Sequence, residues 1–390
     1  SGRNMRLFAS LVLVCAVASV GQAFFHAALP LSSFARPASF VLSDSQLHLS
    51  ARPSAKYGLN VCMNGGMLDS ILERKQKEVE ELKANPPDGV EALLDSKKKV
   101  KSGKFIKAVK KPKGTISVVP QLKGGTPAKN YELNNVDAMI MSAHCYEAGA
   151  HAMSVCTDKE AFGMGYEDLK TAVKQQQNYK GNFPSPLPIL AFDFFLDPIQ
   201  LAVAAQAGAD AVNLNQRILG DQTKDMIDAA DKLGLDALVQ VHSSEELAAA
   251  CEAGAKLVGV TNRDYDNWGL QDEVDEVERL WVKPFEETVF SIIDEVPKGV
   301  HAMAMGGVNE TLMAWTLRDK GYTSVMVGEQ AMMGSQTQQS QTSYSAGFNE
   351  MKGIIMAFRS KGSKKYGPTA TASFYGKGEG AKEELGMISI

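Results

Sequence analysis

A few charged and polar residues come just after short apolar runs of the sequence. Lys123, Asp193 and Arg263 each end or follow such a run. Charged groups at the ends of strands are the ones that hold anionic ligands and exchange protons in barrel enzymes. His242 and His301 also follow or begin apolar runs, but neither has a carboxylate partner at a readable spacing. We interpret these two histidines as core or rim residues and expect any chemistry at the ends of the apolar runs.

The stretch Leu187–Leu219 shows which elements must position these residues. Pro188–Leu190 is apolar, Ile199–Ala207 has the pattern of a helix, Gly208 ends that helix, and Ala211–Leu214 is apolar again. This is a strand–helix–strand unit. Its strands are nearly continuous in apolar residues, which is typical of parallel strands covered on both faces.

The passage from a helix through glycine into a strand recurs along the chain. It begins at Glu147, Gln206, Lys232, Glu252 and Asp319. Glycine after a helix adopts the left-handed conformation without steric cost. The strands expected from this repeat are Thr115–Val119, Met153–Cys156, Pro188–Phe194, Ala211–Leu214, Leu238–Val241, Leu257–Thr261, His301–Met305 and Ser324–Val327. They predict an α/β fold, a (β/α)8 TIM barrel over residues 67–362, since such barrels need about 250 residues. An open doubly wound sheet is the alternative.

The composition is that of one large domain with tails. The chain has 390 residues, a formal charge of −4 and 44% hydrophobic residues, so it is no polyelectrolyte and we predict no nucleic-acid partner. Its five cysteines are odd in number and scattered: Cys15, Cys62, Cys145, Cys156 and Cys251. We therefore expect buried free thiols, with no disulfide framework, metal site or cofactor.

Two compositional regimes precede the expected barrel. Residues 1–23 contain the apolar run Leu7–Val20, which suits a leader and signal peptide and is too short for a permanent membrane anchor. Residues 24–66 are rich in Ser, Ala and Arg with a single acid, Asp44, the profile of a transit peptide. Together they predict a plastid protein with a bipartite presequence and no membrane span after processing. Secretion with a disordered spacer is the alternative, and the lack of paired cysteines counts against it.

Three segments outside the strands carry further expectations. Asp69–Lys83 has opposite charges three and four apart and an apolar face, which predicts an extra N-terminal helix. Lys97–Lys113 is densely basic with apolar residues at helical spacing. It indicates either a docking site for an anionic ligand or protein partner or a solvated helix face. Residues 363–390 are Gly- and Lys-rich and are expected to form a flexible tail or a docking extension.

Several sequence blocks, in order, resemble the indole-3-glycerol phosphate synthase family over residues 67–362. They include LKGGTPAKN from Leu122, SVCTDKEAFGMG from Ser154, LVQVHSSEELAAACEAGAKLVGVTNRD from Leu238 and MGGVNETLMAWTLRDKGYTSVMVGEQAMM from Met305. The resemblance implies a tryptophan-pathway barrel that opens a phosphorylated, anthranilate-derived ketose sugar and closes it onto its own ring carbon. Carbon dioxide and water are lost to give indoleglycerol phosphate. Such a reaction needs a general acid, a carboxylate base and cations for the carboxylate and phosphate of the substrate.

The positions that match the family's acid, base and orienting groups are replaced in this chain. Gln121 and Gln240 stand for glutamates, Phe192 for the general-acid lysine, Thr261 for an asparagine, and Met305 and Gly306 for a Glu-Ser pair. Phenylalanine cannot donate a proton and glutamine cannot accept one as a base. We treat these six positions as degenerate and assign no catalytic residue with confidence.

The positions that match the family's substrate-binding groups partly persist. Lys123 matches the lysine that pairs with the substrate carboxylate, Arg263 lies in the N-x-R-D turn, and Gly307 and Gly328 stand where loops hold phosphate. Glu329 replaces a serine of the family, which would weaken phosphate binding unless Lys or Arg neutralises it.

Each retained residue also has a structural interpretation. Lys123 could bridge to Asp193, and Arg263 could clamp its own loop through Asp264 or Asp266. The glycines Gly307 and Gly328 could serve turns alone.

Three hypotheses follow. The loss of charge at the mouth favours a plastid barrel, a pseudoenzyme in which the ring-closing decarboxylation is lost or greatly weakened. In one version it binds a phosphorylated, carboxylated small molecule; in another it is a subunit of a larger assembly. The alternative is an active synthase in which Lys123 serves as acid and Glu160 or Glu329 as base.

Overall fold

A computed structural model describes residues 66–96, 100–110, 114–129, 132–133, 136–263, 265, 289–334 and 344–360. The expected signal peptide, nearly all of the transit-like segment and the tail 363–390 lie outside these residues. So do Asp264 and Asp266 and parts of the basic segment, residues 97–99 and 111–113.

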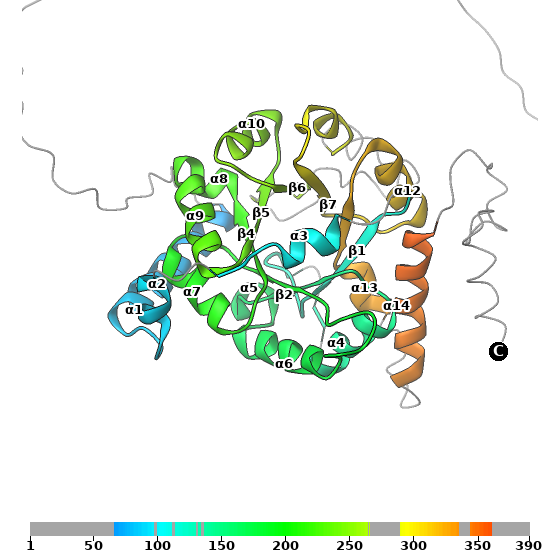
Figure 1. The fold of residues 1–390 in the computed structure, drawn as a ribbon, viewed down its shortest axis with the longest axis horizontal. Helices are drawn as coiled ribbons and strands as arrows, with labels where there is room; N and C mark the ends of the chain where they lie inside the picture. The colour runs from blue at the N-terminus through cyan, green and yellow to red at the C-terminus, as the bar shows by residue number, and fades with distance from the viewer. Residues whose placement is uncertain are drawn as a thin grey trace, which may run out of the picture. The chain divides into compact units, whose positions relative to one another are not determined.

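Within the described residues, eight parallel strands pair in chain order and the eighth pairs with the first, so the sheet closes into a barrel. The strands are β1 (Ser117–Leu122), β2 (Met153–Cys156), β3 (Ile189–Phe192), β4 (Ala211–Asn215), β5 (Asp236–Val241), β6 (Leu257–Thr261), β7 (His301–Met305) and β8 (Ser324–Val327). Helices surround them (Figure 1). The prediction of a TIM barrel is confirmed, and the open doubly wound sheet is wrong.

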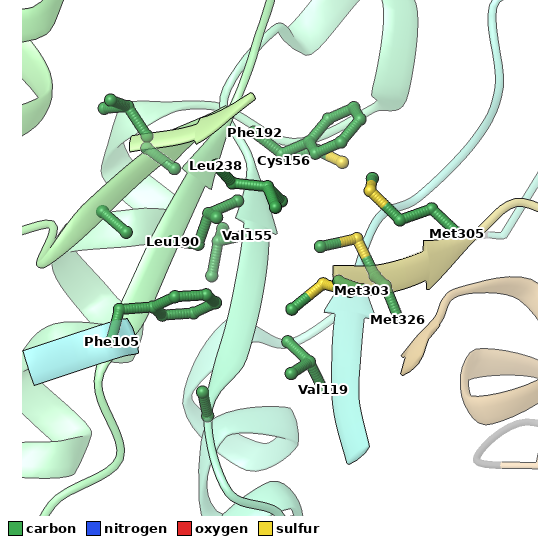
Figure 2. Packing of buried hydrophobic residues seen from close by; sticks show 14 of the residues in the cluster. Phe105, Val119, Val155, Cys156, Leu190, Phe192, Leu238, Met303, Met305 and Met326 are labelled. Carbon is green, nitrogen blue, oxygen red and sulfur yellow. The ribbon is translucent and has the colours of Figure 1, made fainter. Parts of the chain in front are cut away.

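The strands are buried along their whole length, apart from one partly buried residue at the start of β5 and one at the start of β7. Inside the barrel, Leu190 and Leu238 project from β3 and β5 toward the side chains of β7 and β8 (Figure 2). A continuous run of Val, Leu, Ile and Met suits these positions, because one face packs in the barrel and the other against the helices.

Side chains cap the first turn of several of the other helices. These other helices are α2 (Val90–Asp95), α4 (Ala138–Glu147), α5 (Lys159–Phe162), α6 (Tyr166–Gln177), α7 (Pro198–Gln206), α8 (Gln216–Leu219), η1 (Gly220–Gln222), α9 (Thr223–Leu233), α10 (Ser244–Glu252), η2 (Ile293–Glu295), α12 (Thr311–Lys320), α13 (Glu329–Gly334) and α14 (Tyr344–Arg359). Asp197, for example, caps α7 through the backbone N–H of Ile199, and Pro198 occupies the first turn. No helix in the described ranges is both long and apolar enough to cross a membrane.

Helix α1 (Met67–Ala84) is the expected extra helix, and it packs against α7 (Figure 1). Its Lys75 is buried, with Nζ 2.7 Å from Oδ1 of Asp193 and 2.8 Å from Oε2 of Glu78. The neighbouring Arg74 makes two hydrogen bonds to Asp158, of 3.0 and 2.6 Å. Since Asp158 and Asp193 follow β2 and β3, these ion pairs fix α1 at the carboxyl end of the barrel.

The pKa values in this cluster reflect both burial and charge. Burial alone would lower the pKa of Lys75, but the carboxylates of Asp193, Asp158 and Glu78 together raise it above its ordinary value. Lys75 is therefore charged at neutral pH, and its charge is matched by buried carboxylates.

The described part of the basic segment closes the amino end of the barrel. It forms α3 (Lys104–Val109), in which Phe105 and Val109 are fully buried. The backbone N–H groups of Phe105 and Ile106 donate to Oδ2 of Asp236, the first residue of β5. Figure 2 shows Phe105 at the opposite end of the barrel core from Phe192. The described lysines Lys104, Lys107 and Lys110 are exposed, as a solvated helix face requires, and Lys104 pairs with Asp210.

Candidate functional site

The candidate residues come together in one pocket of about 160 Å³ at the carboxyl end of the barrel. All ten line it: Gln121, Lys123, Phe192, Gln240, Thr261, Arg263, Met305, Gly306, Gly307 and Gly328. They come from the ends of β1, β3, β5, β6, β7 and β8 or the residues that follow. The remaining lining residues are Phe162, Tyr265, Val308, Asn309, Met326 and Glu329. The residues matched to the family's site thus lie together at one mouth of the barrel.

Three charged side chains meet in this pocket. Oε1 of Glu329 lies 2.9 Å from Nζ of Lys123 and 2.6 Å from a guanidinium nitrogen of Arg263. The side chain of Lys123 is only 5% exposed and that of Arg263 12%. The two cations that sequence reasoning singled out are thus joined through one carboxylate oxygen.

The pKa values of these groups follow from burial and from each other. Burial lowers the pKa of Lys123, and the attraction of Glu329 only partly opposes this. Burial alone would raise the pKa of Glu329, but Lys123 and Arg263 together hold it below its ordinary value. The carboxyl is therefore ionised at neutral pH, as the ion pairs require.

The partner of Lys123 differs from the one expected on structural grounds. Its carboxylate partner is Glu329, while Asp193 pairs with Lys75 and accepts a hydrogen bond of 2.9 Å from Thr157. The expected bridge from Lys123 to Asp193 is wrong, because Asp193 pairs with Lys75 of the N-terminal helix α1 instead. The proposed clamp of Arg263 on Asp264 or Asp266 lies outside the described residues.

Other side chains that line the pocket are apolar. Phe192 packs edge to face against Phe162, with 5.8 Å between ring centroids. Met305 lies at the same end of the barrel (Figure 2), and it needs the glycine beside it. A Cβ on Gly259 would be 2.4 Å from the sulfur of Met305, so any larger residue at 259 would displace it. These apolar lining residues can hold an apolar group and cannot exchange protons with it.

Gln240 is held by a neighbouring amide. Nδ2 of Asn213 donates to Oε1 of Gln240 over 3.1 Å, and both side chains are buried. The neutral side chain of Gln240 accepts this hydrogen bond but adds no charge to the pocket. Gly328 has a different role, because a Cβ there would be 3.1 Å from both Oε1 of Gln121 and Cε of Lys123. Its lack of a side chain lets Lys123 reach Glu329.

Sequence comparison assigns this barrel to a family. Residues 68–343 match the family model of indole-3-glycerol phosphate synthase. The chain belongs to the indole-3-glycerol phosphate synthase family. It is 30% identical over 266 residues to the indole-3-glycerol phosphate synthase of Thermoanaerobacter sp., a match that covers 68% of this chain and 92% of the relative.

Two further relatives agree with this assignment. The synthase of Chlorobium phaeovibrioides is 31% identical over 274 residues, covering 69% of this chain and 95% of that protein. That of Halalkalibacterium halodurans is 30% identical over 271 residues, covering 69% and 93%. The resemblance found in the motifs therefore extends over more than nine-tenths of the length of these relatives.

The glycines of this indole-3-glycerol phosphate synthase family member serve the backbone as well as the pocket. Gly306 and Gly307 have φ values of 74° and 86°, a conformation that other residues adopt only with strain. A Cβ on Gly306 would also be 3.2 Å from Cγ of Arg263 and from Oγ1 of Thr261. Glycine is thus required at position 307 by the positive φ and at position 328 by the close approach of Gln121 and Lys123, whatever ligand the pocket binds.

His242 has a carboxylate partner after all, so its description as a lone histidine is wrong. Its Nδ1 lies 3.0 Å from Oε2 of Glu246, four residues later at the first turn of α10. Its ring also packs edge to face against Tyr265, with centroids 4.6 Å apart. The spacing of four could have revealed the pair. Ser243 caps α10 by accepting from the backbone N–H of Glu246, and the Glu246 carboxylate accepts from the backbone N–H of His242. His301 lies at the amino end of the barrel, away from the pocket, and burial lowers its pKa.

Proposed function

We propose that this protein is a plastid member of the indole-3-glycerol phosphate synthase family that binds an anionic small molecule in the barrel mouth. In our proposal the ring-closing decarboxylation is lost or greatly weakened. The observation that carries the proposal is the pairing of Lys123 and Arg263 with Glu329 in a pocket where Phe192 and Gln240 are uncharged. Groups that attract charge are present, whereas the matched positions for an acid and a base hold side chains that exchange no protons.

The size of the expected loss in reaction rate favours a lost or weakened reaction over an active synthase. Removing one general acid or base typically costs about 10²- to 10⁴-fold in rate. Here the matched acid and the matched base are both replaced, together with the Glu-Ser pair at Met305 and Gly306. Positioned donors that stabilise developing charge contribute as much again in many enzymes.

We expect the purified protein to form indoleglycerol phosphate at least about 10²-fold more slowly than an ordinary synthase assayed beside it. We also expect it to bind benzoate, a simple aromatic anion, in calorimetry. The affinity should fall about tenfold or more in Lys123→Ala and Arg263→Ala, because each loses a charge-assisted contact. It should fall with rising salt as well.

Lys224→Ala is the matched control for these variants. Lys224 is 62% exposed, pairs with Asp228 and does not line the pocket, so its removal should leave benzoate binding unchanged. Turnover equal to that of the ordinary synthase would contradict the loss of catalysis. Absence of anion binding would instead favour a subunit that uses the barrel as a scaffold.

An active synthase with a rearranged site is the second candidate, and one contact favours it. Lys123, whose pKa burial lowers, lies within hydrogen-bond distance of Glu329, which is the geometry of an acid and base pair. Glu160, the other carboxylate considered, is 74% exposed, pairs with Arg74 and does not line the pocket. The turnover measurement decides between the two candidates.

The plastid location is a proposal that rests on the sequence of the first 66 residues. We expect one cleavage after Ala23 and a second near Gly65, just before α1 begins at Met67. Terminal sequencing of the protein isolated from plastids should find a start near Gly65. A secreted form cut only after Ala23 would contradict the plastid proposal.

A further inference from the structure

The charge inside the pocket is set by Lys123, Arg263 and Glu329. Among the lining residues, which all belong to the described part of the chain, these three carry the charges. Because Oε1 of Glu329 contacts both cations, the carboxylate occupies the place where the two positive charges converge. An incoming anion must share these cations with a carboxylate that is already there.

The sum of these charges favours one class of anion. Two cations and one carboxylate leave the trio with one positive charge in excess. A ligand with a single negative charge brings the sum to zero, whereas a dianion leaves an uncompensated negative charge next to Glu329. In a partly buried pocket such a charge is costly, because the interaction of like charges is only weakly screened.

From this arrangement we infer that Glu329 is a specificity-determining residue that restricts the pocket to singly charged anions and excludes dianions such as phosphomonoesters. The inference rests on the proposed function, since it concerns which anion the same pocket binds. The apolar lining residues Phe162, Phe192 and Met305 indicate that the ligand's body is aromatic or otherwise apolar.

The test compares two probes of similar shape, benzoate and phenyl phosphate, by calorimetry at pH 7.5. Benzoate carries one negative charge at this pH, and phenyl phosphate carries nearly two, because the second pKa of a phosphate ester is about 6. We expect the wild-type protein to bind benzoate more tightly. In Glu329→Gln the trio gains a positive charge, so phenyl phosphate should gain affinity about 10- to 100-fold and more than benzoate does.

A second measurement needs no substitution at the site. When the pH falls from 7.5 to 5, phenyl phosphate becomes a monoanion while benzoate keeps its charge. Over the same range Glu329 stays ionised, because Lys123 and Arg263 hold its pKa below the ordinary value. We therefore expect the affinity of the wild-type protein for phenyl phosphate to rise relative to that for benzoate.

Glu167→Gln is the matched control, because Glu167 is 86% exposed and pairs with Lys170 outside the pocket. It should leave the ratio of the two affinities unchanged. Tighter wild-type binding of phenyl phosphate at pH 7.5, or an unchanged ratio in Glu329→Gln, would overturn the inference and leave anion binding intact. Failure of both probes to bind would overturn the inference together with the proposed anion binding.

Discussion

Replacement of Lys75 by methionine lowers the free energy of unfolding by about 3–5 kcal/mol, the usual cost of removing one partner from a buried ion pair. Methionine fills a similar volume, so little of this loss comes from a cavity. It comes from Asp193, whose side chain has no exposed surface and whose Oδ1 lies 2.7 Å from Nζ of Lys75. Without the lysine this carboxylate stays buried with its charge unmatched. Denaturant unfolding followed by circular dichroism measures the loss.

The size of this loss depends on pH in a direction that can be worked out. Burial raises the pKa of Asp193, and Lys75 opposes that rise; in the variant the pKa rises further. When the pKa of a carboxyl is higher in the folded than in the unfolded protein, the free energy of unfolding decreases as the pH rises from the unfolded pKa through the folded pKa. The deficit of Lys75→Met should therefore be smallest below the unfolded pKa of aspartate and reach full size above the folded pKa of Asp193.

Lys83→Met provides a matched control on the same helix. Lys83 pairs with Asp197 at 2.5 Å, but its side chain is 50% exposed. Exposed ion pairs contribute at most about 1 kcal/mol, because water screens them. Equal losses for the two variants would show that the buried cluster does not hold α1 on the barrel.

Combining Phe192→Lys, Gln240→Glu and Glu329→Ser should raise indoleglycerol phosphate formation by about 10²- to 10⁴-fold over the wild-type rate. The first two changes restore a proton donor and acceptor at positions that line the same pocket. The third frees Lys123 and Arg263 from the carboxylate that now contacts both. Because an acid and a base act as a unit, each single variant should stay close to the wild type.

The control keeps two of these changes and replaces the new lysine by methionine, as Phe192→Met with Gln240→Glu and Glu329→Ser. Methionine is apolar like the phenylalanine it replaces and donates no proton, so this variant should not gain turnover. A comparable gain in the control would mean that the new glutamate and the freed cations restore the reaction without a lysine at position 192. A triple variant that folds and stays at the wild-type rate would show that Gln121, Thr261, Met305 or Gly306 also blocks the family chemistry.

The barrel was predictable because its signals are local. The expected bounds of β2, β6, β7 and β8 coincide with the observed ones, since each strand is a short apolar run between turn residues. The expectation for β1, Thr115–Val119, ended just before Pro120, a residue that is rare inside sheets. The strand instead continues through Pro120 to Leu122, and Pro120 pairs in register with Val327. The missing backbone N–H of Pro120 does not end β1, because the strand pairs with β2 on one side and β8 on the other.

The contacts that give the pocket its electrostatic character were less predictable. Glu329 and Lys123 are 206 residues apart in sequence, and no periodic pattern links them. The motifs placed each residue at the mouth and raised neutralisation of Glu329 by Lys or Arg, but they did not identify which cations would pair with it. The pairing of His242 with Glu246 was different, because a spacing of four at the start of a helix made it readable.

Helix α3 closes the amino end of the barrel, and this closure determines how ligands can enter and leave the pocket. With Phe105 fully buried at the amino end, the described core offers no passage from one end of the barrel to the other. A molecule that enters the pocket must leave by the opening through which it came. Two ligands therefore cannot follow one another through the protein, and the departure rate of one occupant limits the arrival of the next. Long ligands must extend outward from the mouth, where surrounding loops or another protein could hold their far end.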